Sequence, residues 1–205
     1  MTCIKYLIFD LGGVLIDLDK ERCFRSFDAL GFDVRPYVGS FAQTGIFGRF
    51  DRGFSTKDKF CEELYEVGLS RHITTEQIKN SWNDFLVGIP EERLECLFRL
   101  KKKHPLFLLS NTNEIHWDYL KDNYFPYKGL VAEDFFENIF LSFKMHLEKP
   151  EPEMFREVIL QSGVNPSETL FVDDSEINCE SAQREGFHVL HAKNSGEWLT
   201  FFEKE

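Results

Sequence analysis

The sequence lacks the features of several large classes of protein. Its five cysteines are scattered, odd in number and without a CxxC pair, so neither a disulfide framework nor a zinc site is expected. No apolar run approaches the length of a transmembrane helix, and no secretory leader pattern is present. The net charge of −11 disfavours nucleic acid and acidic membranes as partners. These absences predict a cytoplasmic protein with free thiols, either a monomer or a homodimer, whose ligand is small.

Apolar and aromatic residues, by contrast, are plentiful. The 205 residues include 22 phenylalanines, and 42% are hydrophobic, which is enough for a sizeable core. Short apolar runs without polar alternation predict strands that are buried on both faces, as in a parallel sheet. Helical patterns separate the later runs, so the chain is predicted to be α/β, with a doubly wound parallel sheet. The five runs cover residues 3–9, 105–111, 139–142, 169–174 and 187–192.

Residues 18–90 interrupt this alternation of strand and helix. They show helical patterns but no strand pattern, and one of the helices is predicted to begin with a capping box from Thr74 to Gln77. The chain length suits one domain that carries an insertion. We therefore predict a core domain of residues 1–17 and 91–205, with a helical cap domain of residues 18–90 inserted after the first strand.

Polar and charged residues stand where the predicted strands end. Asp10 follows the first run, Ser110 and Asn111 end the second, and Asp173 and Asp174 end the fourth. Parallel strands gather their carboxyl ends at one edge of the sheet, and ligands of doubly wound folds bind at that edge. We therefore expect these side chains to converge on one site.

A lysine, Lys149, lies just before a predicted helix and is expected at the same edge. Three carboxylates packed together repel one another unless a cation intervenes, and oxygen ligands of this kind suit Mg²⁺. An ammonium group, a hydroxyl and the N–H groups at a helix start suit a phosphate. Taken singly, such residues are also typical of turns, helix caps and solvated surfaces. Their coincidence favours a phosphoryl-transfer site, in which a carboxylate attacks a neutralised phosphate.

In order and spacing, four segments resemble the motifs of the haloacid dehalogenase-like (HAD) hydrolase superfamily, whose members are mostly Mg²⁺-dependent phosphatases. The segments are LIFDLGGVL, LLSNTN, EKPEPEMF and FVDDSEINCESAQREGF, and the resemblance covers essentially the whole chain. It implies a Rossmann-like core in which Asp10 is the nucleophile that becomes an aspartyl-phosphate. It also implies that Ser110 and Lys149 hold the phosphate, and that Asp173 and Asp174 bind Mg²⁺ with Asp10. The helical insertion is similar to the family's cap domain, which closes over the site and selects the substrate.

The chain departs from the family pattern at Gly12. Most family phosphatases carry a second aspartate there, which protonates the leaving group and later activates water. The backbone carbonyl of this position still ligates Mg²⁺ in the family, so Gly12 remains a candidate metal ligand. Loss of such an acid costs about 10²- to 10⁴-fold in rate when nothing replaces it.

Three explanations for this departure are open. The chain is similar to bacterial α-D-glucose-1-phosphate phosphatase members of the family, and an anomeric leaving group depends less on an acid. A 2-haloacid dehalogenase also lacks the second aspartate, but that branch needs no metal, and the pair Asp173 and Asp174 argues against it. A protein that binds a phosphorylated ligand without turnover is the third explanation.

Substrate contacts are predicted beside the phosphate and at the entrance of the cap. Asn111 is expected to bind the phosphate next to Ser110, and Asp17, Arg49 and Arg52 are candidates for contacts to the rest of the substrate. A cap residue could also replace the missing acid. The sequence as a whole predicts a Mg²⁺-dependent phosphatase of a small phosphorylated metabolite, with a sugar phosphate as the candidate substrate.

Overall fold

The structure, a computed structural model, describes residues 4–39, 42–194 and 196–203. Five parallel strands form its central sheet in the order β5–β4–β1–β6–β7. Each strand overlaps one of the five apolar runs, so the predicted α/β fold with a parallel sheet is confirmed. The strands are β1 Tyr6–Phe9, β4 Leu106–Ser110, β5 Asn138–Leu141, β6 Thr169–Asp173 and β7 His188–His191.

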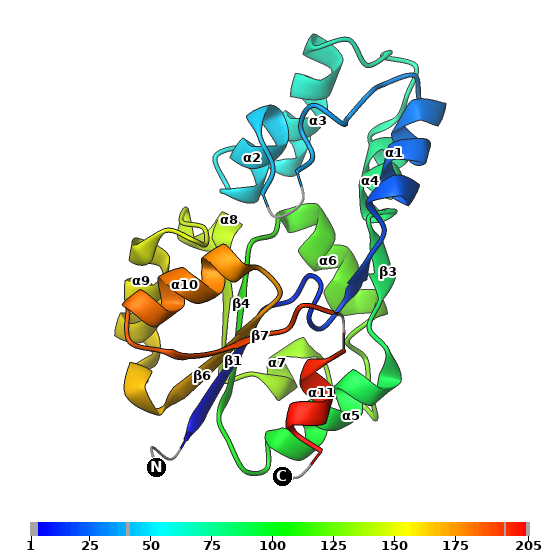
Figure 1. Ribbon diagram of the computed structural model, residues 1–205. Helices are drawn as coiled ribbons and strands as arrows, with labels where there is room; N and C mark the ends of the chain where they lie inside the picture. The colour runs from blue at the N-terminus through cyan, green and yellow to red at the C-terminus, as the bar shows by residue number, and fades with distance from the viewer. Residues whose placement is uncertain (1–3, 40–41, 195, 204–205) are drawn as a thin grey trace.

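Helices cover both faces of this sheet (Figure 1). Helices α9 and α10 lie on one face, and α5, α6 and α11 lie on the other. Because side chains alternate along a strand, Ile8 of β1 packs toward α9 while Leu7 and Phe9 pack toward the opposite layer. The helical elements after residue 90 are α5 Glu91–Leu100, α6 Glu114–Asn123, α7 Ala132–Phe135, α8 Ser142–Met145, α9 Pro152–Ser162, the 3₁₀ turn η1 Pro166–Glu168, α10 Glu176–Arg184 and α11 Trp198–Phe201.

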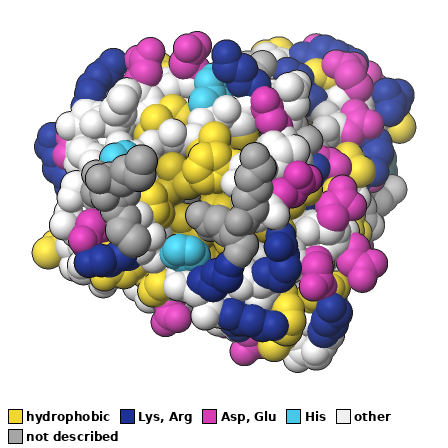
Figure 2. Space-filling view, turned by 60° about the horizontal axis from the view of Figure 1, so that its bottom comes forward, with side chains coloured by type: hydrophobic (Ala, Val, Ile, Leu, Met, Phe, Trp, Pro, Cys, Tyr) yellow, Lys and Arg dark blue, Asp and Glu magenta, His cyan; other side chains and the backbone are white. Residues whose placement is uncertain are grey.

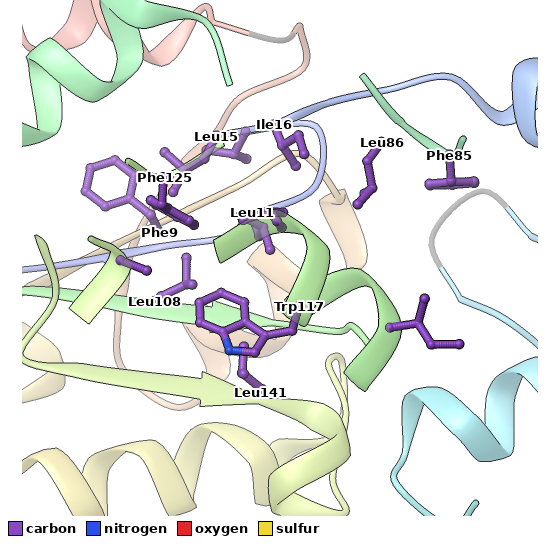
Figure 3. Close-up of a cluster of buried hydrophobic side chains, with 14 of the residues drawn as sticks. Phe9, Leu11, Leu15, Ile16, Phe85, Leu86, Leu108, Trp117, Phe125 and Leu141 are labelled. Carbon is purple, nitrogen blue, oxygen red and sulfur yellow. The ribbon is translucent and has the colours of Figure 1, made fainter. Parts of the chain in front are cut away.

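Figure 3 shows part of the larger hydrophobic layer. Phe9, Leu108 and Leu141 from three neighbouring strands meet Trp117 of α6 there. All four side chains are at most 4% exposed. This packing holds β1, β4 and β5 in register and thereby fixes the relative positions of the residues at their carboxyl ends.

Four further helices lie together beyond the carboxyl edge of the sheet (Figure 1). They have their own aromatic centre, in which the Phe47 ring lies 6.1 Å from Phe27, 5.0 Å from Phe60 and 4.8 Å from Trp82, measured between ring centroids. Each of these rings comes from a different helix, so one phenylalanine joins the whole group. The helices are α1 Lys20–Ala29, α2 Gly45–Asp51, α3 Lys57–Glu66 and α4 Thr75–Asn83.

The capping box predicted at the start of α4 is confirmed. The Gln77 N–H donates to the Thr74 hydroxyl at 3.2 Å, and the Thr74 N–H donates to the Gln77 side chain at 2.9 Å. Both N–H groups belong to the first turn, which has no intrahelical acceptor for them.

The expectation that residues 18–90 contain no strand is wrong at both ends of that segment. Asp17–Leu18 forms β2 and Leu86–Gly88 forms β3, and the two pair antiparallel, with Asp17 opposite Gly88. These strands have two and three residues. A hydrophobic period cannot be recognised over so few positions, so only the long-range pairing defines them.

The amino ends of the strands lie at the end of the molecule that Figure 2 brings forward. Lys and Arg side chains are interspersed there with Asp and Glu side chains. Among the described residues, no helix is long and apolar enough to cross a membrane. Four cysteines are buried free thiols, as predicted, and Cys3 lies outside the described residues; the four are Cys23, Cys61, Cys96 and Cys179.

Candidate active site

Three neighbouring strands bring the predicted site residues together. Asp10 directly follows β1, Ser110 ends β4 and Asp173 ends β6. Because β1 lies between β4 and β6 and all three are parallel, these residues share one edge of the sheet. Asp10, Asp173 and Asp174 each offer a carboxylate oxygen, and the three oxygens lie within 4.8 Å of one another.

Lys149 is the cation at the centre of this cluster. Its side chain is 1% exposed, and Nζ lies 2.7 Å from Asp10 Oδ1 and 2.6 Å from Asp173 Oδ2. Asn111 holds the lysine's backbone from both sides: its Nδ2 donates to the Lys149 carbonyl and its Oδ1 accepts from the Lys149 N–H, both at 2.8 Å. The side chain of Asn111 therefore positions Lys149, and since Asn111 also lines the pocket over the cluster, its contact with phosphate stays a prediction.

The cluster carries more negative than positive charge. Burial raises the pKa of Asp10 to about 7, although Lys149 lowers it, and Asp173 and Asp174 raise it further. Burial and the neighbouring Asp173 likewise raise the pKa of Asp174 to about 6. For Lys149, burial alone would lower the pKa, but the two carboxylates it contacts hold it above its ordinary value. Two buried carboxylates and one half-buried carboxylate, that of Asp174, thus face a single ammonium group, and this excess favours an additional cation.

The three carboxylates differ in how many of their oxygens are left available to a metal ion. Asp173 Oδ1 accepts from the Ser175 N–H at 2.8 Å and from Asn178 at 3.1 Å, and Oδ2 accepts from Lys149 and Asn178. Its oxygens are therefore occupied by protein donors, whereas Asp10 uses one oxygen for Lys149. Asp10 and Asp174 are the two carboxylates suited to direct metal contact, and Asp173 is suited to orienting Lys149.

The structure requires glycine at only one of the two glycine positions that follow Asp10. Gly13 has a φ of +72°, and a Cβ at this position would lie 2.2 Å from Asp174 Oδ2, so both the backbone and the neighbouring carboxylate require glycine. At Gly12 a Cβ would meet only Leu18 Cδ1, at 3.1 Å. A side chain at position 12 is therefore compatible with the fold, and the missing acid is not imposed by the backbone.

A pocket opens over this cluster, between the sheet edge and the helical insertion. On the sheet side it is lined by Asp10, Ser110 and Lys149. Asp51 of α2 and Trp82 of α4 line it on the other side. One space thus gives a ligand access both to the charged cluster and to the four-helix group.

The structure does not bring the two predicted arginines into this pocket. Arg49 Nη2 lies 3.2 Å from Glu63 Oε1, and Arg52 Nη2 lies 2.6 Å from Glu148 Oε1. Neither arginine is among the residues that line the pocket. Asp17 likewise lies 2.8 Å from the guanidinium of Arg93. These side chains belong to ion pairs around the pocket.

Asp51 of the helical insertion does line the pocket, although the sequence did not lead us to predict it as a site residue. Phe47, Phe50 and Asp51 are all at most 7% exposed, so they share the buried face of α2. A signal was present in the sequence, because positions four apart lie on one side of a helix and Asp51 follows Phe47 by four residues. A carboxylate in an otherwise apolar stripe marks a candidate functional residue.

Comparisons with known proteins agree with this geometry. A D-ribitol-5-phosphate phosphatase of Bacteroides thetaiotaomicron is 33% identical over 196 residues, covering 95% of each chain. The crystal structure of a HAD family enzyme from that organism, BT-2542, as an Asp12Ala mutant with magnesium and inorganic phosphate, superposes with a TM-score of 0.93. Its sequence is 41% identical, and the match covers 98% of this chain and 99% of that one. A HAD-like hydrolase structure from Porphyromonas gingivalis gives a TM-score of 0.90 at 33% identity, with 98% and 97% coverage.

The family model of haloacid dehalogenase-like hydrolases matches residues 4–186. This range contains every strand except β7, which begins at His188, and it contains all the strand-end residues of the four motifs. The chain therefore belongs to the haloacid dehalogenase-like hydrolase family.

Proposed function

We propose that this hydrolase is a Mg²⁺-dependent phosphatase of a small phosphorylated metabolite, with a polyol phosphate or sugar phosphate as its substrate. The observation that carries the proposal is the buried contact of Lys149 with Asp10 and Asp173 at the floor of the pocket. A D-ribitol-5-phosphate phosphatase among the relatives, and a similar enzyme crystallised with magnesium and phosphate, support it.

The proposed reaction uses Asp10 as the nucleophile. Its carboxylate attacks phosphorus in line, the ester P–O bond breaks, and an aspartyl-phosphate forms while the leaving oxygen takes a proton from water and departs as the alcohol. Water then attacks this intermediate, which releases inorganic phosphate and restores the carboxylate. The Ser110 hydroxyl and the Lys149 ammonium group bind the oxygens of the transferring group. Asn111 acts through Lys149, whose backbone it holds.

The donor set of the pocket suits Mg²⁺, which prefers carboxylates, backbone carbonyls and phosphate oxygens. We assign Asp10, Asp174 and the Gly12 carbonyl as its protein ligands, with Asp173 in a supporting position. When bound, the ion neutralises charge on the phosphate and on the carboxylate cluster.

We further propose that residues 18–90 act as a cap domain over a core of residues 1–17 and 91–205. Two helices of this segment, α2 and α4, contribute Asp51 and Trp82 to the pocket wall, opposite the catalytic cluster. A ligand held at Asp10 would therefore extend toward the cap.

A panel of phosphate esters, D-ribitol 5-phosphate among them, tests the proposed function. We expect phosphate release that requires Mg²⁺ and is abolished by EDTA or by Asp10→Asn. Asp58→Asn, the same substitution at an exposed position of the insertion, serves as the control. Activity that survives Asp10→Asn would remove the assigned nucleophile. Saturable ligand binding without turnover of any ester would instead support a binding protein, and halide release from a 2-haloacid with EDTA present would support a dehalogenase.

A further inference from the structure

Asp51 is a buried carboxylate in the pocket with no described role. It ends α2, is 7% exposed, and lines the same pocket as Asp10 and Lys149. Among the described residues, no lysine or arginine forms an ion pair with it, and its carboxylate accepts one hydrogen bond, from Asn113 Nδ2 to Oδ1 at 2.9 Å. A buried carboxylate with so little compensation is unfavourable unless a ligand supplies further donors.

A chain of hydrogen bonds from the sheet side holds Asp51 in place. Asn113 Oδ1 accepts from the His116 N–H at 3.0 Å, which fixes the orientation of the amide. Its Nδ2 then faces both Asp51 Oδ1 and His116 Nδ1, the latter at 3.3 Å. His116 Nε2 lies 3.0 Å from the Trp82 carbonyl, which only accepts, so this nitrogen carries the proton and Nδ1 is the acceptor.

Asn113 and His116 use their hydrogen-bonding groups for contacts within this network. Burial lowers the pKa of His116 to about 4, so its ring is neutral, and it stacks on Trp82 with 4.4 Å between ring centroids. Asn113 has used both of its N–H groups and its oxygen. Asp51 is thus held by a fully satisfied network, and the donors for its remaining lone pairs have to come from the pocket.

The surroundings of Asp51 favour a neutral hydroxyl over a cationic group as the ligand. Burial raises the pKa of Asp51 to about 7, with Glu148 raising and Asn113 lowering it. A hydroxyl can pair with either protonation state, whereas an ammonium group needs the ionised form. Phe85 and the ring carbons of Trp82 form apolar walls beside Asp51 and suit the carbon chain that carries such hydroxyls. The Trp82 Nε1 is a buried donor without a partner among the described residues, and a hydroxyl can accept from it.

We propose that Asp51 is a specificity-determining residue, which binds hydroxyl groups on the carbon chain of the phosphorylated substrate. The proposal rests on the phosphatase function above, since it concerns the part of the same substrate that lies beyond the phosphate. Asp51 would thereby select polyol and sugar phosphates over alkyl phosphates of equal length.

Three esters separate this role from the alternatives: D-ribitol 5-phosphate, pentyl phosphate and 4-nitrophenyl phosphate. Asp51→Asn keeps an oxygen for the Asn113 donor but removes the charge. We expect kcat/KM for the ribitol ester to fall by about 10- to 100-fold, the usual effect of losing a hydrogen bond to a charged group. The other two esters should change by less than about threefold, as should all three esters with the control Asp58→Asn.

Each other outcome overturns the proposal. An equal fall for the ribitol and pentyl esters, with the aryl ester unchanged, would make Asp51 a proton donor to basic leaving groups. An equal fall for all three esters would indicate a structural role. No fall for the ribitol ester, or a preference of the unsubstituted enzyme for 5-aminopentyl phosphate over D-ribitol 5-phosphate, would also refute hydroxyl recognition.

A binding measurement keeps this test independent of turnover. Calorimetry compares the affinities of Asp10→Asn for D-ribitol 5-phosphate and pentyl phosphate, and repeats the comparison with Asp51→Asn added. We expect the ribitol ester to bind tighter only when Asp51 is present. If the unsubstituted protein turned over none of the esters and this binding pattern were still found, the phosphatase function would be refuted and Asp51 would remain a hydroxyl-binding residue. Equal affinities in both backgrounds would refute the role of Asp51 itself.

Discussion

The substitution Gly13→Ala tests the metal site directly, because it adds one methyl group beside Asp174, a proposed Mg²⁺ ligand. The new Cβ would lie 2.2 Å from Asp174 Oδ2 and 2.8 Å from Asp174 Cγ. Such contacts are too short to persist, so the carboxylate has to move by about 1 Å, and a displacement of this size near reacting groups costs about 10²-fold in rate. Weaker Mg²⁺ binding by about 10- to 100-fold is expected as well.

The same substitution also strains the backbone, and Gly163→Ala measures that part alone. Gly163 has a φ of +69°, close to the +72° of Gly13, but a Cβ there would meet nothing within 4 Å. An alanine in this conformation costs about 1–2 kcal/mol, which lowers Tm by about 2–8 °C in a protein of this size. Both variants should show this loss of stability.

Only Gly13→Ala should lose activity and metal affinity. The assay is phosphate release from 4-nitrophenyl phosphate over a range of Mg²⁺ concentrations, combined with thermal melting with and without the ion. We expect a higher half-saturating Mg²⁺ concentration and a smaller stabilisation by Mg²⁺ for Gly13→Ala than for Gly163→Ala. Equal Mg²⁺ dependence of the two variants would refute the assignment of Asp174 as a metal ligand.

Two further predictions concern the same floor of the pocket. Gly12→Asp should raise turnover of alkyl phosphates relative to aryl phosphates by about tenfold or more, because it restores an acid where an added Cβ meets only Leu18 Cδ1, at 3.1 Å. An unchanged ratio, or the same gain with Gly12→Asn, would contradict this role. Lys149→Met should lower the free energy of unfolding by about 3–5 kcal/mol in EDTA, because it leaves buried carboxylates uncompensated, and added Mg²⁺ should restore part of the loss. Thermal melting measures this loss of stability. The control is Lys121→Met, which removes an ion pair at the surface and should lower the free energy of unfolding by less than about 1 kcal/mol. Equal losses for the two variants would contradict the prediction.

The strand-end residues were predictable because each depends on local pattern and on one topological rule. Asp10, Ser110 and Asp173 each close a short apolar run, and parallel pairing brings such ends together wherever the strands are neighbours. The contact of Lys149 with two of these carboxylates agrees with its predicted position. Its support by Asn111 was not foreseen, because it joins residues 38 positions apart.

The pocket residues of the helical insertion were harder to predict, because a long polar side chain near a pocket has many possible partners. Arg49 and Arg52 stand beside Asp51 in the sequence, yet their guanidinium groups pair with glutamates outside the pocket. Asp51 instead occupies the buried face of α2. Which of the three charged residues at positions 49–52 lines the pocket depends on the rotation of one helix against its neighbours.

The amino-acid sequence was enough to predict the parallel sheet, the helical insertion and the order of the strand-end residues, because these follow from hydrophobic periods over a few neighbouring positions. It could not predict that both oxygens of Asp173 accept from protein donors, that a Cβ at Gly12 would meet only Leu18 Cδ1, or that Asp51 lines the pocket. These properties depend on distances between atoms far apart in the chain, and packing and hydrogen bonding across elements set those distances.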